Sequence, residues 1–220
     1  MLIRIVALLI ALTVHEYAHG RAAYAMGDST AKVAGRLTLN PLAHIDPIGF
    51  LMLWIFRFGW AKPVPINPFY FRNRRQGLIL VSAAGPAANI VTAFFVLILL
   101  KTILLLGLQQ TKLLFVSVLF VPLRQILYQT FIYNLYLAIF NLIPVPPLDG
   151  SKILMGLLPA ARVSTYVELE TYGPILLILL LYFGVIGKIL HPAVTFCLTL
   201  LDVASHWIVF GGLELLLSLF

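Results

Sequence analysis

The distribution of apolar residues along the chain predicts a membrane protein built from helices. Apolar runs of about the length that crosses a bilayer recur along the whole sequence. They cover residues 2–26, 78–100, 113–145, 173–190 and 193–220. The third run is too long for one straight helix, and Pro122 predicts a break within it. We therefore expect an all-α polytopic membrane protein with about five to six transmembrane helices.

A different pattern occupies the stretch between the first two spans. Residues 35–41 alternate between apolar and polar side chains and end at Asn40-Pro41, which predicts a strand or one arm of a β-hairpin. Residues 48–60 are apolar but too few to cross a bilayer, which favours a re-entrant or tilted segment. We therefore expect a short re-entrant or β-hairpin segment near residues 35–60.

The first apolar run contains three ionisable side chains, His15, Glu16 and His19. On a helix the two histidines project from the same face, so their imidazoles can bind one metal ion. Hydrolytic zinc centres use this His-Glu-x-x-His spacing, with the glutamate taking a proton from metal-bound water. A coincidental polar face is the weaker interpretation, because unpartnered ionisable groups are costly in lipid. We predict a metal site on this helix.

A second polar element lies far along the chain. Residues 144–147 contain three prolines, which unwind a helix, and Asp149 follows them. Catalytic zinc takes three protein ligands and leaves one position for water, so Asp149 is predicted to join His15 and His19. The three residues reach the same depth if residues 27–77 all lie on the cytoplasmic side. The positive-inside rule places the basic residues of that stretch on the same side.

Other polar groups allow more than one interpretation. Asn89 lies among small residues of the second span, where it either links helices or contacts the substrate. His44 stands in a proline-rich turn, which favours a structural role over a role as an extra ligand. Asp202 and His206 have helical spacing, but the neighbouring Trp207 favours a polar patch at a membrane boundary over a second metal site.

Composition supports the membrane assignment. Of the 220 residues, 61% are hydrophobic and 10% are charged, and the mean hydropathy is +1.02. A net charge of +7 would suggest nucleic acid as the partner of a soluble protein. No nucleic-acid motif accompanies it here, and basic loops at an anionic inner leaflet explain the charge, so we expect no nucleic-acid partner.

Together these motifs resemble the site-2 protease family of intramembrane zinc metalloproteases. The matching stretches extend from about residue 8 to residue 155. They are His15-Glu16-x-x-His19, Gly35-Arg36-Leu37-Thr38-Leu39-Asn40-Pro41, Lys62-Pro63-Val64-Pro65, Gly85-Pro86-Ala87-Ala88-Asn89 and Asn141-x-x-Pro144-x-Pro146-x-x-Asp149-Gly150. We see no helix before the histidine-bearing span, no PDZ-like insertion and no CBS pair, so the chain resembles a compact form of the family.

The resemblance implies one zinc ion held by His15, His19 and Asp149, with Glu16 as the general base. It also gives Asn141, and less directly Asn89, a part in holding the substrate or the oxyanion. The implied reaction is hydrolysis of peptide bonds within the transmembrane segment of a protein or peptide substrate, inside the lipid bilayer.

The same resemblance implies one transmembrane metalloprotease domain over residues 1–220. Its core motifs would lie in residues 8–155, and C-terminal helices would occupy residues 173–220. The expected location is a prokaryotic cell membrane, with the active site nearer the cytoplasmic side. The sequence leaves the physiological substrate and the oligomeric state open.

Two other functions share parts of this pattern. A membrane metal transporter would also place histidine and aspartate within spans, but transport needs polar groups along a path through both leaflets. The groups found here are predicted to converge at one depth. An inactive scaffold that binds membrane proteins would have no need of the intact set His15, Glu16, His19 and Asp149. We therefore expect an intramembrane zinc metalloprotease.

Overall fold

The computed structural model describes residues 2–56, 60–105 and 114–211, and this part of the chain is helical. The longer helices are α1 (Leu2–Ala25), α3 (Pro47–Phe56), α4 (Arg74–Leu105), α5 (Leu114–Asn141), α6 (Asp149–Leu157), α7 (Ala160–Tyr182) and α8 (Val185–His206). The short elements are α2 (Thr30–Val33), η1 (Pro41–His44), η2 (Pro68–Tyr70) and η4 (Trp207–Gly211). The described ranges contain no β-strand, so the predicted all-α class is confirmed.

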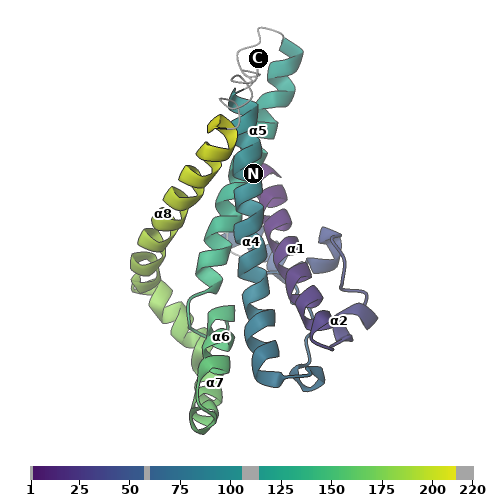
Figure 1. Cartoon of the computed structure of the whole chain (residues 1–220), viewed down its shortest axis with the longest axis vertical. Helices are drawn as coiled ribbons and strands as arrows, with labels where there is room; N and C mark the ends of the chain where they lie inside the picture. Colours follow the sequence, from purple (N-terminus) through teal and green to yellow (C-terminus); the bar gives the residue numbers. More distant parts are fainter. Residues whose placement is uncertain (1, 57–59, 106–113, 212–220) are drawn as a thin grey trace.

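Helices α1, α4 and α5 form the central bundle (Figure 1). Three alanines of α1 are fully buried at 7, 11 and 23, and such small residues let neighbouring helices approach closely. Ala93 and Leu97 of α4 pack against Phe131 and Leu135 of α5, and Val194 of α8 completes this core. Helix α8 therefore packs against the bundle through this core, while Leu177 and Leu180 of α7 pack against Ile143 and Leu148.

Three described helices are long and apolar enough to cross a membrane: α1, α4, and α8 with its continuation to Gly211. The prediction of five to six spans is thus confirmed only in part. The apolar part of α7, Glu170–Tyr182, is shorter than a span. Helix α5 continues through Pro122, so the predicted break there is wrong.

The segment between α1 and α4 leaves and returns at the same end of α1. The Asp28 carboxylate accepts hydrogen bonds from the backbone N–H of Thr30 (2.9 Å) and of Asn67 (2.7 Å). The carbonyl of Met26 accepts another from the N–H of Arg72 (3.0 Å). Both ends of the segment are therefore fixed beside the last turn of α1.

The middle of this segment doubles back on itself. Ile45 and Ala61 form an isolated antiparallel bridge, and the Lys62 N–H donates to the His44 carbonyl (2.9 Å). Helix α3 lies between these arms, and its 10 residues extend about 15 Å, half the thickness of a bilayer core. The chain therefore doubles back here, and its entry into the bilayer remains a prediction.

The predicted strand at residues 35–41 is wrong. The Thr38 hydroxyl accepts a bond from the Asn40 N–H (3.1 Å), and the Asn40 side chain accepts one from the Leu42 N–H (3.1 Å). Such local bonds replace the ladder that a strand would need, and Pro41 has no N–H to donate. The alternation of residue types was therefore overridden by turn-forming side chains.

The path of this segment predicts a labelling pattern for single cysteines introduced into a Cys197→Ser background. Ser29→Cys and Arg72→Cys should react with a membrane-impermeant thiol reagent from the same side, because both positions lie at one end of α1. Leu2→Cys should react from the opposite side, because α1 is long enough to span the bilayer. Labelling of Ser29→Cys and Arg72→Cys from opposite sides would show that the segment crosses the membrane.

Candidate metal centre and active site

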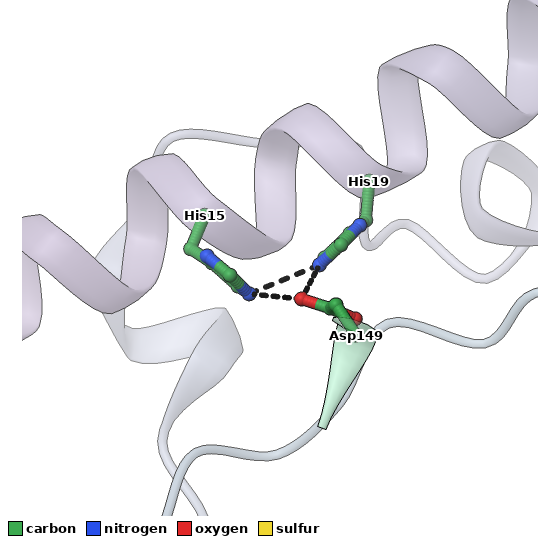
Figure 2. A group of neighbouring side chains, drawn as sticks. All are labelled: His15, His19 and Asp149. Atoms are coloured by element: carbon green, nitrogen blue, oxygen red, sulfur yellow. Dashed lines mark hydrogen bonds and ion pairs between the residues drawn. The ribbon is translucent and has the colours of Figure 1, made fainter. Parts of the chain in front are cut away.

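Two histidines of α1 and one aspartate of α6 converge on a single point (Figure 2). The Nε2 atoms of His15 and His19 are 3.0 Å apart, and each lies 3.1 Å from Oδ2 of Asp149. All three residues are buried. Residues 130 or more positions apart in the sequence thus place three potential ligand atoms within one small space.

The orientation of His15 is set from behind by an amide. Its Nδ1 is 2.6 Å from Oδ1 of Asn89. The amide nitrogen of Asn89 donates to the carbonyl of Ala11 (2.9 Å) and to Oδ1 of Asn134 (2.7 Å), and Asn134 donates to the carbonyl of Thr130 (2.8 Å). Because these bonds fix the oxygen of Asn89 toward the ring, Nδ1 of His15 must carry the proton.

The orientation of His19 is set in the same way by the backbone. Its Nδ1 lies 2.7 Å from the carbonyl oxygen of Val81 in α4, and a carbonyl can only accept a hydrogen bond. In the neutral ring the proton is therefore on Nδ1, and Nε2 presents a lone pair. The same holds for His15, so both Nε2 atoms face Asp149 as acceptors.

Three acceptor atoms that face one another repel unless a cation or a proton lies among them. Zinc ligands at about 2.0–2.1 Å in tetrahedral geometry lie roughly 3.3 Å apart, close to the 3.0–3.1 Å separations found here. Histidine bound to metal usually donates its other N–H to a carbonyl or side-chain oxygen, as both rings do. The cluster therefore suits a zinc-like metal ion.

A tight turn and a close helix contact bring Asp149 to this point. The Cβ of an alanine at Gly150 would lie 2.6 Å from the carbonyl oxygen of Ile143, so glycine lets the start of α6 rest on the turn that follows α5. At the other end of α6, Arg75 donates from Nε to the carbonyl of Gly156 (2.5 Å) and from Nη2 to that of Leu157 (2.9 Å). Arg75 thereby caps α6 and holds it against α4.

Gly85 of α4 lies directly against the two rings. A Cβ at this position would lie 2.7 Å from Cε1 of His15 and would overlap Nε2 of His19. The glycine therefore leaves the space in which the ligand atoms converge. Small residues in the Gly85-Pro86-Ala87-Ala88 stretch predicted a close approach of helices, but the sequence did not identify the histidines as the neighbours.

Glu16 faces the same region and is held by an extended segment. Its Oε2 accepts a hydrogen bond from the backbone N–H of Val64 (2.7 Å). We refer to residues 62–68, which contain three prolines and adopt no long helix, as the strap. The strap lies against α1 at Gly20, where an added Cβ would be 3.4 Å from Cγ1 of Val64.

Both ends of the strap are anchored by charged side chains. Arg36 donates from Nη2 to the carbonyl of Lys62 (2.7 Å), and the fully buried Asp28 accepts from the N–H of Asn67. Burial by itself would raise the pKa of Asp28, but hydrogen bonds from Thr30 and Asn67 outweigh it and lower the pKa below its usual value. Asp28 is therefore ionised near neutral pH and holds the strap by charge-assisted bonds.

A cavity of about 470 Å³ opens onto the cluster. Its lining includes His15, Glu16, His19, Asp149 and Asn141, together with residues of the strap. Asn141, at the end of α5, donates one amide hydrogen to the carbonyl of Leu137 (2.9 Å), which leaves its oxygen and second hydrogen for other partners. Metal ligands, a carboxylate and an amide thus share one cavity.

The remaining candidate residues lie elsewhere. Asn89 is fully buried behind His15, does not line the cavity and bonds groups on α1 and α5, so it links helices, which is one of the two roles that its position in the sequence allowed. His44 is buried and bonds the carbonyl of Thr38 (2.9 Å), apart from the three-residue cluster. Asp202 pairs with Lys101 (2.8 Å) and His206 stacks on Phe210, so neither joins a metal cluster among the described residues.

The helical membrane fold, the two-histidine, one-aspartate cluster and the neighbouring glutamate are those of a membrane-embedded metallohydrolase centre. Comparison with known proteins gives the family. Residues 3–182 match peptidase family M50, so the chain belongs to this site-2 protease family, as the motifs predicted. It is an integral membrane protein of a zinc-metalloprotease family.

Individual relatives support this assignment. The chain is 37% identical over 188 residues to the "Putative zinc metalloprotease YwhC" of Bacillus subtilis (strain 168), which covers 86% of this chain and 84% of the relative. It is 28% identical over 214 residues to the "Putative zinc metalloprotease Rip2" of Mycolicibacterium smegmatis, covering 93% and 76% respectively. No solved structure matches the chain significantly.

The contact at Gly85 predicts that Gly85→Ala weakens metal binding by about 10-fold or more, because the added methyl group forces the imidazoles apart. Competition with a chromogenic chelator on the purified protein would measure the affinity. Gly187→Ala is the matched control, since a Cβ there meets nothing within 4 Å. Unchanged affinity in Gly85→Ala would mean that the ligand atoms do not need this space.

Proposed function

We propose that the chain is an intramembrane zinc endopeptidase that hydrolyses peptide bonds within transmembrane segments of membrane proteins. The observation that carries this proposal is the convergence of three acceptor atoms, 3.0–3.1 Å apart, in a cavity that Glu16 also lines. Membership of a zinc-metalloprotease family and three candidate membrane spans support the reaction class and its setting.

His15, His19 and Asp149 would hold one zinc ion. When bound, zinc would supply a Lewis acid that activates water near neutral pH and polarises the substrate carbonyl. The chain itself keeps the ligands in their metal-binding form, because Asn89 and Val81 hold the ring protons of His15 and His19 on the far side of each ring.

Glu16 is the general base in this proposal. One of its oxygens accepts the Val64 N–H, so the carboxylate is oriented before the substrate arrives, and the other oxygen can take a proton from water. The same carboxyl group can then return that proton to the nitrogen of the leaving amine. The strap thus contributes to catalysis by fixing the position of the base.

Asn141 is proposed to hold the substrate or to donate to the oxyanion that forms at the scissile carbonyl. It lines the cavity, and one of its amide hydrogens is not used by the bond to Leu137. The substrate backbone must leave its helix to be cut, so helix-weakening residues near the cut would favour cleavage.

The proposed location is a prokaryotic cell membrane with the cavity nearer the cytoplasmic side. Basic residues gather at the end of α1 beside the cavity. They lie near the end of α1, on the segment between α1 and α4, and in the first turn of α4: Arg21, Lys32, Arg36, Lys62, Arg72, Arg74 and Arg75. Short loops rich in lysine and arginine favour the cytoplasmic side. A transport function has less support, because transport needs polar groups along a path through both leaflets, whereas the described ranges contain a single metal-compatible cluster.

The proposal predicts that Glu16→Gln abolishes proteolysis but not metal binding. Loss of the base should lower the rate by about 10²–10⁴-fold, while glutamine keeps an oxygen for the Val64 N–H. Cleavage of a transmembrane reporter by the purified enzyme, with and without a chelator, measures the rate, and elemental analysis measures the zinc content. Retained cleavage in this variant would refute the role of Glu16.

A second prediction separates ligand from base. Loss of a residue that only hydrogen-bonds to a metal ligand typically lowers metal affinity by about 10–100-fold. Asp149→Asn should lower zinc affinity by more than this, and activity should return in part at high zinc concentration. Glu16→Gln serves as the control, since its zinc affinity should remain normal. Stoichiometric zinc in Asp149→Asn under chelator competition would remove Asp149 from the ligand set.

A further inference from the structure

Ser82 of α4 lines the cavity beside the metal cluster, and the site as described gives its hydroxyl no role. The cavity of about 470 Å³ is lined by Ser82 together with the three potential ligands and Glu16. Ser82 is 3% exposed, whereas the amide-bearing residue of the same lining, Asn141, is only partly buried. Among the described lining residues, Ser82 is therefore the most deeply buried polar side chain that is neither a potential ligand nor the proposed base.

The hydroxyl of Ser82 forms no hydrogen bond within the part of the chain that the structure describes. A serine or threonine inside a helix often donates to the carbonyl four residues earlier, as Thr102 does to Ile98 (2.9 Å). Two other buried hydroxyls, those of Thr13 and Thr130, also lack partners, but neither residue lines this cavity. Because an unpaired buried hydroxyl is unfavourable, we expect a molecule that enters the cavity to supply its partner.

The face of α4 that carries Ser82 is the face that contacts the two histidines. Ser82, Gly85 and Asn89 follow one another at intervals of three and four residues, so they project from one side of the helix. Asn89 bonds His15 through its oxygen (2.6 Å). A Cβ at Gly85 would lie 2.7 Å from Cε1 of His19. Ser82 continues this face by one turn toward the start of α4, next to the rings.

The chemistry of peptide hydrolysis supplies the missing partner. When water adds to the carbonyl carbon, the electron pair of the C=O bond moves to the oxygen, which becomes negatively charged. Donors placed around that oxygen stabilise the charge, most effectively in a cavity shielded from bulk water. A serine hydroxyl has one hydrogen to donate, and the hydrogen of Ser82 is not used by another group.

We propose that Ser82 is a further catalytic residue, whose hydroxyl donates a hydrogen bond to the carbonyl oxygen of the scissile peptide bond. This inference rests on the proposed peptidase function. The hydrogen bond would strengthen as negative charge develops on that oxygen, and the hydroxyl would keep its proton throughout. Glu16 thus remains the group that transfers the proton. Asn141, from α5, would donate to the same oxygen or hold the substrate backbone.

The test measures kcat, KM and zinc affinity for the purified full chain carrying Ser82→Ala, with a transmembrane reporter as substrate. Alanine keeps the site small and suits a helix, but it removes the donor. The value of kcat should fall by about 10–100-fold, because the lost bond acts mainly in the transition state. The KM and the zinc affinity should stay within about twofold of the wild type.

Ser205→Ala is the matched control. It removes a buried hydroxyl of α8 that donates to the carbonyl of Asp202 (3.0 Å) and does not line the cavity. Its kcat, KM and zinc affinity should equal those of the wild type.

Two results for Ser82→Ala would overturn this inference. An unchanged kcat would show that the hydroxyl is not needed, and a zinc affinity that falls as much as kcat would show that it supports the metal cluster instead. Full activity in Ser82→Ala, beside an active wild type and an inactive Glu16→Gln, would overturn this inference and leave the proposed function intact. A wild type that cleaves no reporter would overturn both.

Discussion

The organisation of this protein depends on holding three electron-pair donors face to face inside a bundle of apolar helices. Such an arrangement is unfavourable by itself, because the lone pairs of His15 and His19 and the carboxylate of Asp149 repel in a medium of low polarity. Hydrogen bonds from behind hold it in place. Asn89 and the Val81 carbonyl fix the two rings, so both present Nε2 to the same point. A metal cation would then complete a site whose geometry already exists.

Close packing lets these groups meet. Gly85 leaves room at the two rings, and Gly150 lets the start of α6 rest on the turn that follows α5. Arg75 caps the far end of α6 and ties it to α4, so the position of Asp149 depends on contacts more than 10 Å away along that helix. Each of these residues affects the cluster without being a candidate ligand, which is usual where ligands come from different helices.

The strap is the part of the segment between α1 and α4 that lies at the cavity of the metal cluster. Val64 contacts Glu16 at its centre, while Asp28 and Arg36 anchor its ends. Prolines keep the strap extended and lack an N–H. Of the remaining backbone N–H groups, that of Val64 donates to Glu16 and that of Asn67 donates to Asp28. The same segment returns to the end of α1 from which it left, and its strap lies beside Glu16 at the cavity.

The sequence by itself determined the helical membrane class, the pairing of His15 with His19, and the family, because these follow from apolar length, the 3.6-residue period of a helix and the spacing of motifs. It also predicted that Asp149 lies with the histidines, because the basic residues between the first two spans favour a topology in which both motifs reach the same depth. The strand prediction was wrong because the side chains of Thr38 and Asn40 form local hydrogen bonds with the backbone. The alternation of apolar and polar residues gives no sign of these bonds. Only the tertiary structure decided that Asn89 holds His15, that Val64 holds Glu16, and that Gly85 faces both rings. These contacts join residues from 48 to 74 positions apart, and no local pattern of residue types specifies which distant backbone or amide group will lie opposite.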